Sequence, residues 1–169
     1  WALSDLTWWA VAVGNASFVA ATGCMWLGCR RFNGRTMVWA SLLVVAAVIG
    51  AAASVAVEGE SGDDWTGALW MFVPLIVFAA AGAVECFRDA LRESRTAWVL
   101  GGVLGLQALY YVSRTTAFLT SGPDSALFQT AFGTVTTGFI TVTLTIVAVV
   151  VTSVLRATRR WVLTDQARY

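Results

Sequence analysis

The sequence predicts an all-α, polytopic membrane bundle of five transmembrane helices, and three observations support this. First, 58% of the 169 residues are hydrophobic and 12% are charged, and the mean hydropathy is +0.72. Soluble domains are about 45–50% apolar and about 25% charged, so an ordinary water-soluble domain is excluded. Second, five apolar stretches each reach the length of about 20 residues that a bilayer-crossing helix needs. Third, the arginines are concentrated in alternate loops.

The five stretches account for most of the chain. Pro74 lies inside the third stretch, and a membrane helix tolerates it because neighbouring groups satisfy the freed carbonyl. The connecting loops are short, and no internal repeat or linker is present, so we expect one membrane domain over residues 1–156. The predicted spans cover residues 6–29, 36–57, 65–87, 97–120 and 126–155.

The charges predict an orientation. All 11 cationic side chains are arginines, and ten of them lie in the first loop, the third loop and the C-terminal segment. The second loop is acidic and contains no arginine. Because arginine-bearing loops are cytoplasmic, the N-terminus is predicted outside and the C-terminus in the cytoplasm. The nine tryptophans fall near the ends of the spans, where their amphipathic rings prefer the headgroup level.

Missing residue types exclude several kinds of chemistry. The chain has no histidine and no lysine, which excludes a Schiff-base cofactor, a His-ligated haem and a Ser–His catalytic pair. Its three cysteines lack metal-ligand spacing, so we expect them to be packing residues and expect no metal or cofactor in this chain. A net charge of +1 provides no general attraction to nucleic acid.

Arg114 is the most unusual residue, because it lies in the outer half of the fourth span. A charged side chain at a membrane-helix centre costs roughly 2.5–3.5 kcal/mol on insertion scales, so it should face the bundle interior or reach outward. Gln107 and Tyr111 share its helix face, and Tyr110 is adjacent. We predict that these four residues line a pocket for a lipid-like or amphipathic small molecule. The alternative is an ion pair between Arg114 and an outer acid, namely Asp5, Glu58 or Asp64.

Other polar residues lie within the spans. Asn15 is near the middle of the first span, where we expect an interhelical hydrogen bond, and we include it among the candidate pocket residues. Glu85 lies near the inner end of the third span, and we expect it to pair with an inner arginine such as Arg88 or Arg31; a proton relay is the alternative. A threonine stripe on the fifth span and a Gly101/Gly105 pair on the fourth predict helix–helix packing. The alternative for the stripe is that it lines a cavity. The stripe consists of Thr130, Thr134, Thr137, Thr141 and Thr145.

The chain continues past the fifth span with heptad spacing, although Thr and Asp interrupt its apolar seam. This predicts that residues 157–169 begin a cytoplasmic signalling helix directed toward a partner domain or partner chain. The alternative is an amphipathic tail that ends at the membrane surface. The seam consists of Val151, Leu155, Thr158, Val162, Asp165 and Tyr169.

Two segments resemble a known family. Residues 25–35 read MWLGCRRFNGR, which resembles a pattern in the multi-span membrane regions that precede bacterial GGDEF diguanylate cyclase domains. The C-terminal TDQARY, residues 164–169, is similar to the lead-in of such a cyclase, in which an Asp–x–Leu–Thr–Gly segment follows directly. The matching positions of the first segment and its helix are Asn15, Trp26, Gly28, Arg30 or Arg31, Phe32, Gly34 and Arg35.

The resemblance implies a sensory module in the bacterial cytoplasmic (inner) membrane, truncated before its catalytic domain. Such a module forms a homodimer and controls a cyclase that joins two GTP molecules into cyclic di-GMP. GTP and Mg²⁺ then belong to the catalytic domain, and no catalytic residue lies in this chain. Two alternatives stay open. The first is a small transporter or channel subunit, which Pro74 and Arg114 within the spans favour. The second is a membrane-embedded enzyme, which would need clustered His, Asp or Glu.

Overall fold

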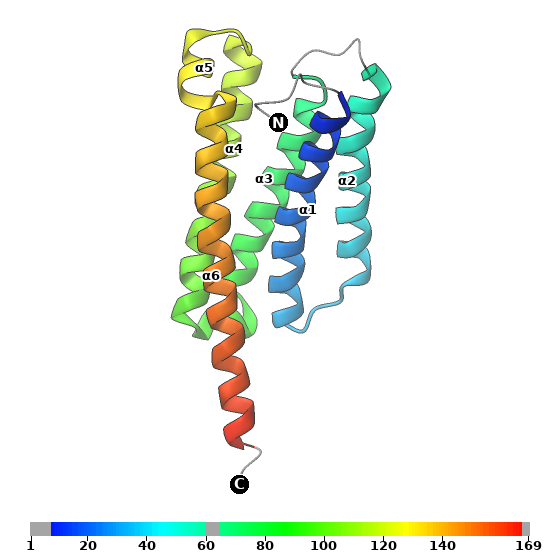
Figure 1. Cartoon of the computed structure of the whole chain (residues 1–169). Coiled ribbons are helices and arrows are strands. Elements are labelled where there is room, and N and C mark those ends of the chain that lie inside the picture. The colour runs from blue at the N-terminus through cyan, green and yellow to red at the C-terminus, as the bar shows by residue number, and fades with distance from the viewer. Residues whose placement is uncertain (1–7, 60–64, 167–169) are drawn as a thin grey trace.

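A computed structural model describes residues 8–59 and 65–166, and these residues form helices without any strand (Figure 1). Five helices in this part of the chain are long and apolar enough to cross a membrane, which confirms the predicted five-span, all-α architecture. Two short helices accompany them, the 3₁₀-helix η2 (Asp89–Glu93) and α5 (Ala126–Phe132). The long helices are α1 (Trp8–Phe32), α2 (Val38–Glu58), α3 (Ala68–Cys86), α4 (Arg95–Ser121) and α6 (Thr134–Gln166).

The first four spans agree with the predicted ranges to within three residues. Differences of three residues occur at the end of α1, which is at Phe32 and not at residue 29, and at the start of α3, which is at Ala68 and not at residue 65. Gly67 precedes it with φ +73°, and a Cβ at this position would lie 2.5 Å from Ser54 Oγ on α2. A side chain at residue 67 would therefore meet both backbone strain and a steric clash, so glycine fixes the start of α3.

The fifth predicted span, residues 126–155, is confirmed as an apolar span over Phe128–Val150, but it is not one continuous helix. The helix is broken at Gly133, so that α5 ends at Phe132 and α6 begins at Thr134. Gly133 adopts an extended conformation, and a Cβ there would overlap with the carbonyl oxygen of Gln129. Ser125 caps α5 by accepting a hydrogen bond from Phe128 N at 3.2 Å. Thr130 is consequently separated from the threonine stripe of α6.

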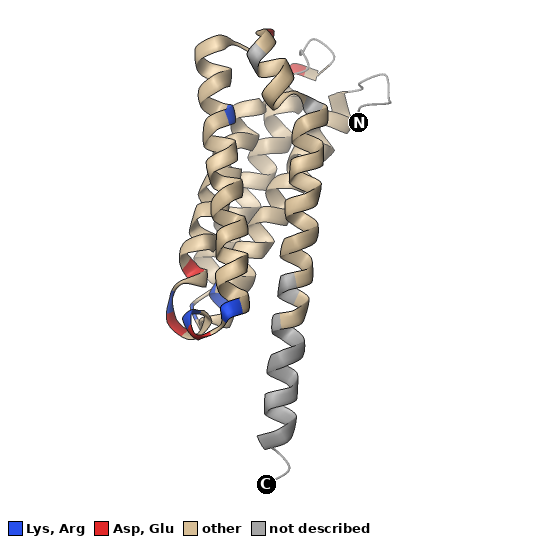
Figure 2. Cartoon of the chain, turned by 90° about the vertical axis from the view of Figure 1, so that its left-hand side faces the viewer, with Lys and Arg blue, Asp and Glu red and all other residues tan. Residues whose placement is uncertain are grey.

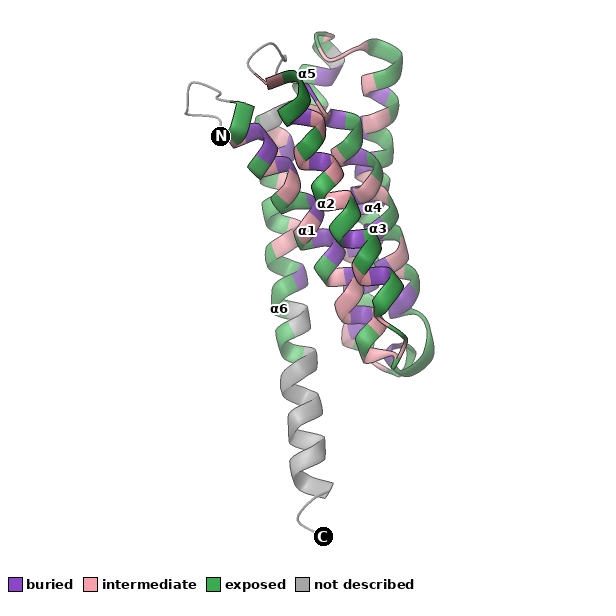
Figure 3. Ribbon diagram, turned by 90° about the vertical axis from the view of Figure 1, so that its right-hand side faces the viewer, coloured by how far each residue is buried: buried purple, intermediate pink, exposed green. Residues whose placement is uncertain are grey.

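The helices pack mainly along the chain order. α1 packs on α2 and α3, α3 packs on α4, and α4 packs on α6, so that α2 and α6 lie at the two edges (Figure 1). Buried residues face these contacts and exposed residues face outward (Figure 3). Gly101 allows α4 to approach α3 closely, because a Cβ there would lie 2.9 Å from the Phe87 ring. The Gly101 part of the predicted small-residue contact is therefore formed, with α3 as its partner.

The outward surfaces are apolar, as expected for helices that face lipid. Trp39 and Val57 on α2 are 80% and 85% exposed, whereas Phe72 and Leu75 on α3 are fully buried. Among the tryptophans whose burial the structure describes, Trp26 is the buried one, and its ring stacks on Phe78 at 5.4 Å.

α6 extends beyond the other helices at one end of the bundle, which we call the stalk end; the opposite end is the α5 end (Figure 1). With 33 residues, α6 is about 50 Å long. Figure 2 shows basic and acidic residues gathered in the loops of the stalk end. The arginine-bearing loops and the projecting part of α6 therefore share one end of the molecule. This is the arrangement that the alternation of arginine-rich and arginine-free loops predicted.

Glu85 joins the loops at the stalk end. Its carboxylate lies 3.3 Å from Arg30 Nη1 and 3.4 Å from Arg35 Nε, and it accepts a 2.9 Å hydrogen bond from Asn33 Nδ2. The expected pairing of Glu85 with inner arginines is confirmed, but the partners are Arg30 and Arg35. The two arginines named as examples, Arg88 and Arg31, are exposed and do not pair with it.

Two further contacts complete this network. Asn33 Oδ1 accepts a hydrogen bond from Leu91 N at 3.3 Å, and Arg35 Nη2 donates to Asp89 Oδ2 at 2.8 Å. The hydrogen bond to Asp89, assisted by the charge of Glu85, raises the pKa of Arg35, so this guanidinium stays charged. We call the set Arg30, Asn33, Arg35, Glu85 and Asp89 the clasp. It connects the α1–α2 loop to the end of α3 and to η2.

Candidate functional site

The face of α4 predicted to carry the pocket is buried in the bundle. Gln107, Tyr111 and Arg114 are 4%, 2% and 4% exposed, so the i, i+4, i+7 spacing identified one inward-facing surface. Tyr110 is half-buried beside them. This surface lies toward the α5 end, away from the clasp.

Aromatic rings surround the Arg114 guanidinium. Its Cζ atom lies 4.7 Å from the ring centroid of Phe72, 5.6 Å from that of Trp65 and 5.8 Å from that of Phe128. Rings within about 6 Å of a guanidinium attract it through their quadrupole. Trp65 and Phe128 also meet edge to face at 5.0 Å. The turn before α3, α3 itself and α5 thus form an aromatic cage of Trp65, Phe72 and Phe128.

Within the described residues, no carboxylate lies within ion-pair distance of Arg114, and its Nε is buried without a hydrogen-bond partner. Glu58, one of the expected partners, accepts a 3.0 Å hydrogen bond from Thr66. The other two expected acids, Asp5 and Asp64, lie outside the described residues. In the described part of the chain the positive charge is therefore met by aromatic faces and not by an acid.

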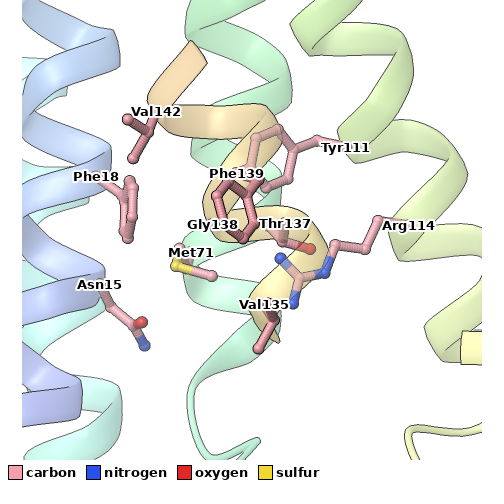
Figure 4. Close-up of a pocket in the computed structure, with 10 residues that line it drawn as sticks. All are labelled: Asn15, Phe18, Met71, Tyr111, Arg114, Val135, Thr137, Gly138, Phe139 and Val142. Carbon is pink, nitrogen blue, oxygen red and sulfur yellow. The ribbon is translucent and has the colours of Figure 1, made fainter. Parts of the chain in front are cut away.

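A cavity of about 440 Å³ adjoins Arg114 and lies among α1, α3, α4 and α6 (Figure 4). Arg114, Asn15, Tyr111 and Thr137 supply its polar groups, and the rest of the lining is apolar apart from a glycine. Figure 4 shows the Arg114 side chain extending from α4 toward Thr137 and Val135 of α6. The lining residues are Asn15, Phe18, Met71, Tyr111, Arg114, Val135, Thr137, Gly138, Phe139 and Val142.

Three of the five predicted pocket residues line this cavity, namely Asn15, Tyr111 and Arg114. The other two bind neighbouring helices instead. Gln107 Nε2 donates to Thr22 Oγ1 of α1 at 3.3 Å, and the Tyr110 hydroxyl lies 2.7 Å from Thr137 Oγ1 of α6. A polar side chain on the predicted helix face can form a hydrogen bond to a neighbouring helix and then not line the cavity. Sequence spacing does not reveal such a contact.

Asn15 also differs from expectation. It is 4% exposed, yet in the described residues its amide makes no hydrogen bond to another helix. It lines the cavity across from Arg114 (Figure 4). The expected interhelical bond is therefore absent from the described structure, and its amide is available to a molecule in the cavity.

Two threonines of the stripe, Thr137 and Thr141, serve helix packing, and Thr137 also lines the cavity. The Tyr111 hydroxyl lies 3.1 Å from Thr141 Oγ1, and Thr137 additionally donates to Phe132 O at 3.0 Å. Thr137 and Thr141 are both buried. These contacts hold α6 against α4 beside the cavity.

Sequence reasoning missed the aromatic cage. Phe72 and Trp65 lie seven residues apart, which places them on one face of a helix, but Trp65 belongs to the turn before α3. Phe128 reaches Arg114 only because the chain breaks at Gly133 and α5 lies across this end of the bundle. A glycine alone does not indicate the break, because Gly138 lies inside α6 without interrupting it.

The three cysteines are free thiols, and the interpretation as packing residues holds for Cys29 and Cys86 but not for Cys24. Cys29 and Cys86 are buried with their sulfurs 3.7 Å apart, and Cys24 is exposed. No group of three or more His, Cys, Asp or Glu suited to a metal ion occurs within the described ranges.

Comparisons of the chain with models of protein families, with curated proteins and with solved structures find no match. The chemistry of the site must therefore be argued from its own residues. One guanidinium, one amide and two hydroxyls border an apolar cavity. This combination suits the recognition of an amphipathic molecule, since apolar walls with a few placed polar groups are typical of small-molecule sites.

Proposed function

We propose that this chain is a sensory and dimerising membrane module that controls a cytoplasmic diguanylate cyclase. It would lie in the bacterial cytoplasmic membrane with the N-terminus outside and the C-terminus inside, and it would bind an amphipathic ligand in the cavity. The observation that supports the proposal is the course of α6. This helix supplies five of the ten lining residues and continues to Gln166 beyond the other helices.

α6 is suited to transmit a signal because few elements hold it. Its backbone lies close to α4 and α5, whereas in the described part of the bundle no Cα atom of α6 comes within 8 Å of one in α1, α2 or α3. Side-chain packing reaches further near Ala148, which shares a buried cluster with Cys29 and Cys86. A ligand that enters between α1 and α6 would change the position of α6 relative to α4. Because the helix is continuous, the change would reach its projecting end.

In the proposed dimer the projecting ends of two α6 helices pair and bring two catalytic domains together, each with one GTP and its Mg²⁺. The connector residues Leu155, Thr158, Val162 and Asp165 lie on α6, and Tyr169 lies outside the described residues. Their heptad spacing supports a paired helix.

A small transporter or channel subunit is the second candidate. The break at Gly133 and the carboxylate-free surroundings of Arg114 in the described structure favour it, since transporters use broken helices and intramembrane charges. However, the half of the bundle toward the stalk end is packed. Cys86, Ala97 and Leu104 are fully buried there, so the cavity does not continue along the bundle.

Cysteine cross-linking tests the dimer. In a background with Cys24, Cys29 and Cys86 replaced by Ala, Leu155→Cys and Val162→Cys should each form a disulfide-linked dimer in membranes. Ser153→Cys and Arg160→Cys fall off the seam by helical spacing and serve as controls. Equal cross-linking at seam and control positions, or none at any of them, would contradict the paired connector.

Cellular cyclic di-GMP tests the link to a cyclase. The reading frame that encodes this chain is expected to continue past Tyr169 into an Asp–x–Leu–Thr–Gly segment, and Arg114→Leu should change the cyclic di-GMP level at unchanged expression. A different downstream domain would refute the cyclase assignment. Efflux of solutes from liposomes that contain the purified chain would favour the transporter instead.

Labelling in sealed vesicles tests the orientation. Cysteines placed at Glu60 and Arg92 should react with an impermeant reagent from opposite faces. Labelling of both from one face would refute the five-span layout.

A further inference from the structure

We infer that the cavity binds a single-chain amphiphile with a carboxylate head group, and that the carboxylate pairs with Arg114 while the alkyl chain lies along α1 and α6. This inference deepens the proposed function, because it specifies the ligand of the proposed sensory site. It can be tested by binding alone, without any cyclase.

Arg114 determines the head group. Its side chain is 4% exposed, its Nε has no hydrogen-bond partner, and among the described residues no acid neutralises its charge. A guanidinium carries five N–H donors in a planar fork that matches the two oxygens of a carboxylate. A buried cation with an unused donor beside a cavity therefore favours a ligand that carries anionic oxygens.

The remaining polar groups limit the charge of that ligand. Asn15 offers an amide across the cavity. Tyr111 and Thr137 offer hydroxyl groups, but each of these already has a partner on the facing helix, Thr141 on α6 and Tyr110 on α4 respectively. Among the described lining residues Arg114 is the one cation, which suits a single negative charge. A carboxylate satisfies this condition, and Asn15 can donate to one of its oxygens.

The walls determine the rest of the molecule. Phe18 and Met71 line one side and Phe139 and Val142 the other, and none of these side chains requires a hydrogen-bond partner. A volume of about 440 Å³ lies in the lower half of the range of about 300–1,000 Å³ for small-molecule sites. One alkyl chain is therefore favoured over the two chains of a phospholipid.

The position of the cavity provides a route from the bilayer. Phe139 and Val142 of α6 are 74% and 54% exposed, and Phe18 of α1 is 38% exposed, so the wall residues also face the outside of the bundle. Because the Cα atoms of α6 and α1 stay more than 8 Å apart in the described structure, an amphiphile can enter sideways between the two helices beside the cavity.

The test is binding of dodecanoate to the chain in phosphatidylcholine nanodiscs, measured as the excess over empty nanodiscs. Dodecanol and dodecyltrimethylammonium carry the same alkyl chain with a neutral and a cationic head. We expect dodecanoate to bind at least about tenfold more tightly than either, since a hydrogen-bonded charge pair is lost with them. Arg114→Gln should abolish this preference, whereas Arg92→Gln, which removes an exposed arginine at the stalk end, should leave it unchanged.

A second variant tests the cavity without touching Arg114. A Cβ at Gly138 meets no atom within 4 Å, so Gly138→Leu fills the cavity from α6 without a clash. It should abolish dodecanoate binding. Gly102→Leu is the matched control, because Gly102 has the same open surroundings on an exposed face of α4. Unchanged binding in Gly138→Leu would overturn the assignment of the site.

Two results would overturn the choice of ligand. Equal binding of dodecanoate and dodecanol would refute the carboxylate head group. Phospholipid that copurifies with the chain only when Arg114 is present would show that the ligand is a phospholipid and not a single-chain amphiphile. The proposed function fails separately. If dodecanoate binds as expected while seam cysteines do not cross-link and cyclic di-GMP does not change, the inference stands and the sensory role falls.

Discussion

Replacing Glu85 by Gln should destabilise the bundle, because this substitution removes the anion that Arg30 and Arg35 share in the clasp. The Glu85 side chain is 5% exposed, and the arginine side chains are 22% and 35% exposed. The new glutamine side chain would keep the size and one acceptor oxygen for Asn33. The variant therefore isolates the loss of charge from the loss of packing.

The magnitude follows from the distances and exposures. At 3.3 Å and an effective dielectric constant of about 20, the pair of Arg30 and Glu85 is worth about 5 kcal/mol before solvation is counted. Removing one partner of a buried pair typically costs about 3–5 kcal/mol, whereas an exposed pair contributes about 0–1 kcal/mol. Because the arginines are partly exposed and regain water, we expect a loss of about 2–4 kcal/mol.

The assay is reversible unfolding in mixed micelles, followed by far-UV circular dichroism and by tryptophan fluorescence. Trp26 reports on this region, because its ring stacks on Phe78 and Arg30 lies 5.5 Å from its centroid. Glu93→Gln is the control, since Glu93 is an exposed acid of η2. A loss in Glu85→Gln no larger than that in Glu93→Gln would refute the view that the clasp stabilises the fold.

Three further predictions use the same unfolding assay. Tyr111→Phe should cost about 0.5–1.5 kcal/mol by removing the hydroxyl that meets Thr141, and adding Thr141→Val should cost little more; additive losses would contradict this hydrogen bond. Gly133→Ala should destabilise by about 1–3 kcal/mol because its Cβ overlaps with Gln129 O, whereas Gly102→Ala should be neutral or stabilise by up to about 1 kcal/mol; equal effects would contradict the break. Gly23→Ala should cost about 1–3 kcal/mol because its Cβ would lie 2.6 Å from Val44 Cγ1, and Val44→Ala should remove this penalty in the double mutant; a penalty that persists would contradict the close contact of α1 and α2.

The sequence predicted the spans because length and hydropathy are local properties. Four spans were correct to within three residues, and the inward face of α4 followed from the spacing of Gln107, Tyr111 and Arg114. Helical spacing identifies which residues share a face, and the cost of a charge in lipid indicates that this face is turned inward.

The partners of these residues could not be predicted, because they depend on tertiary contacts. Glu85 pairs with Arg30 and Arg35 since the loop after α1 folds over α3, and nothing in the spacing distinguishes these arginines from Arg31 or Arg88. The break at Gly133 was hidden in the same way. An apolar stretch of sufficient length is equally compatible with one helix or with two, and hydropathy does not separate the two cases.

Among the described residues, Glu85 and Arg114 are the two buried charged side chains, and the fold surrounds them with different kinds of partners. At the clasp, Glu85 has two arginines and an asparagine as partners, so its charge is compensated, although Arg30 Nε, like Arg114 Nε, is buried without a hydrogen-bond partner. At Arg114 the described residues provide three aromatic rings, a cavity and no acid. An uncompensated charge lowers stability, and an apolar side chain at residue 114 would avoid this cost. Because no acid among the described residues pairs with Arg114, a site that retains such a cost beside a cavity favours a ligand that supplies an anion. The same reasoning predicts that Arg114→Leu stabilises the ligand-free chain while it removes binding, and a destabilised Arg114→Leu would show that the arginine serves the fold instead.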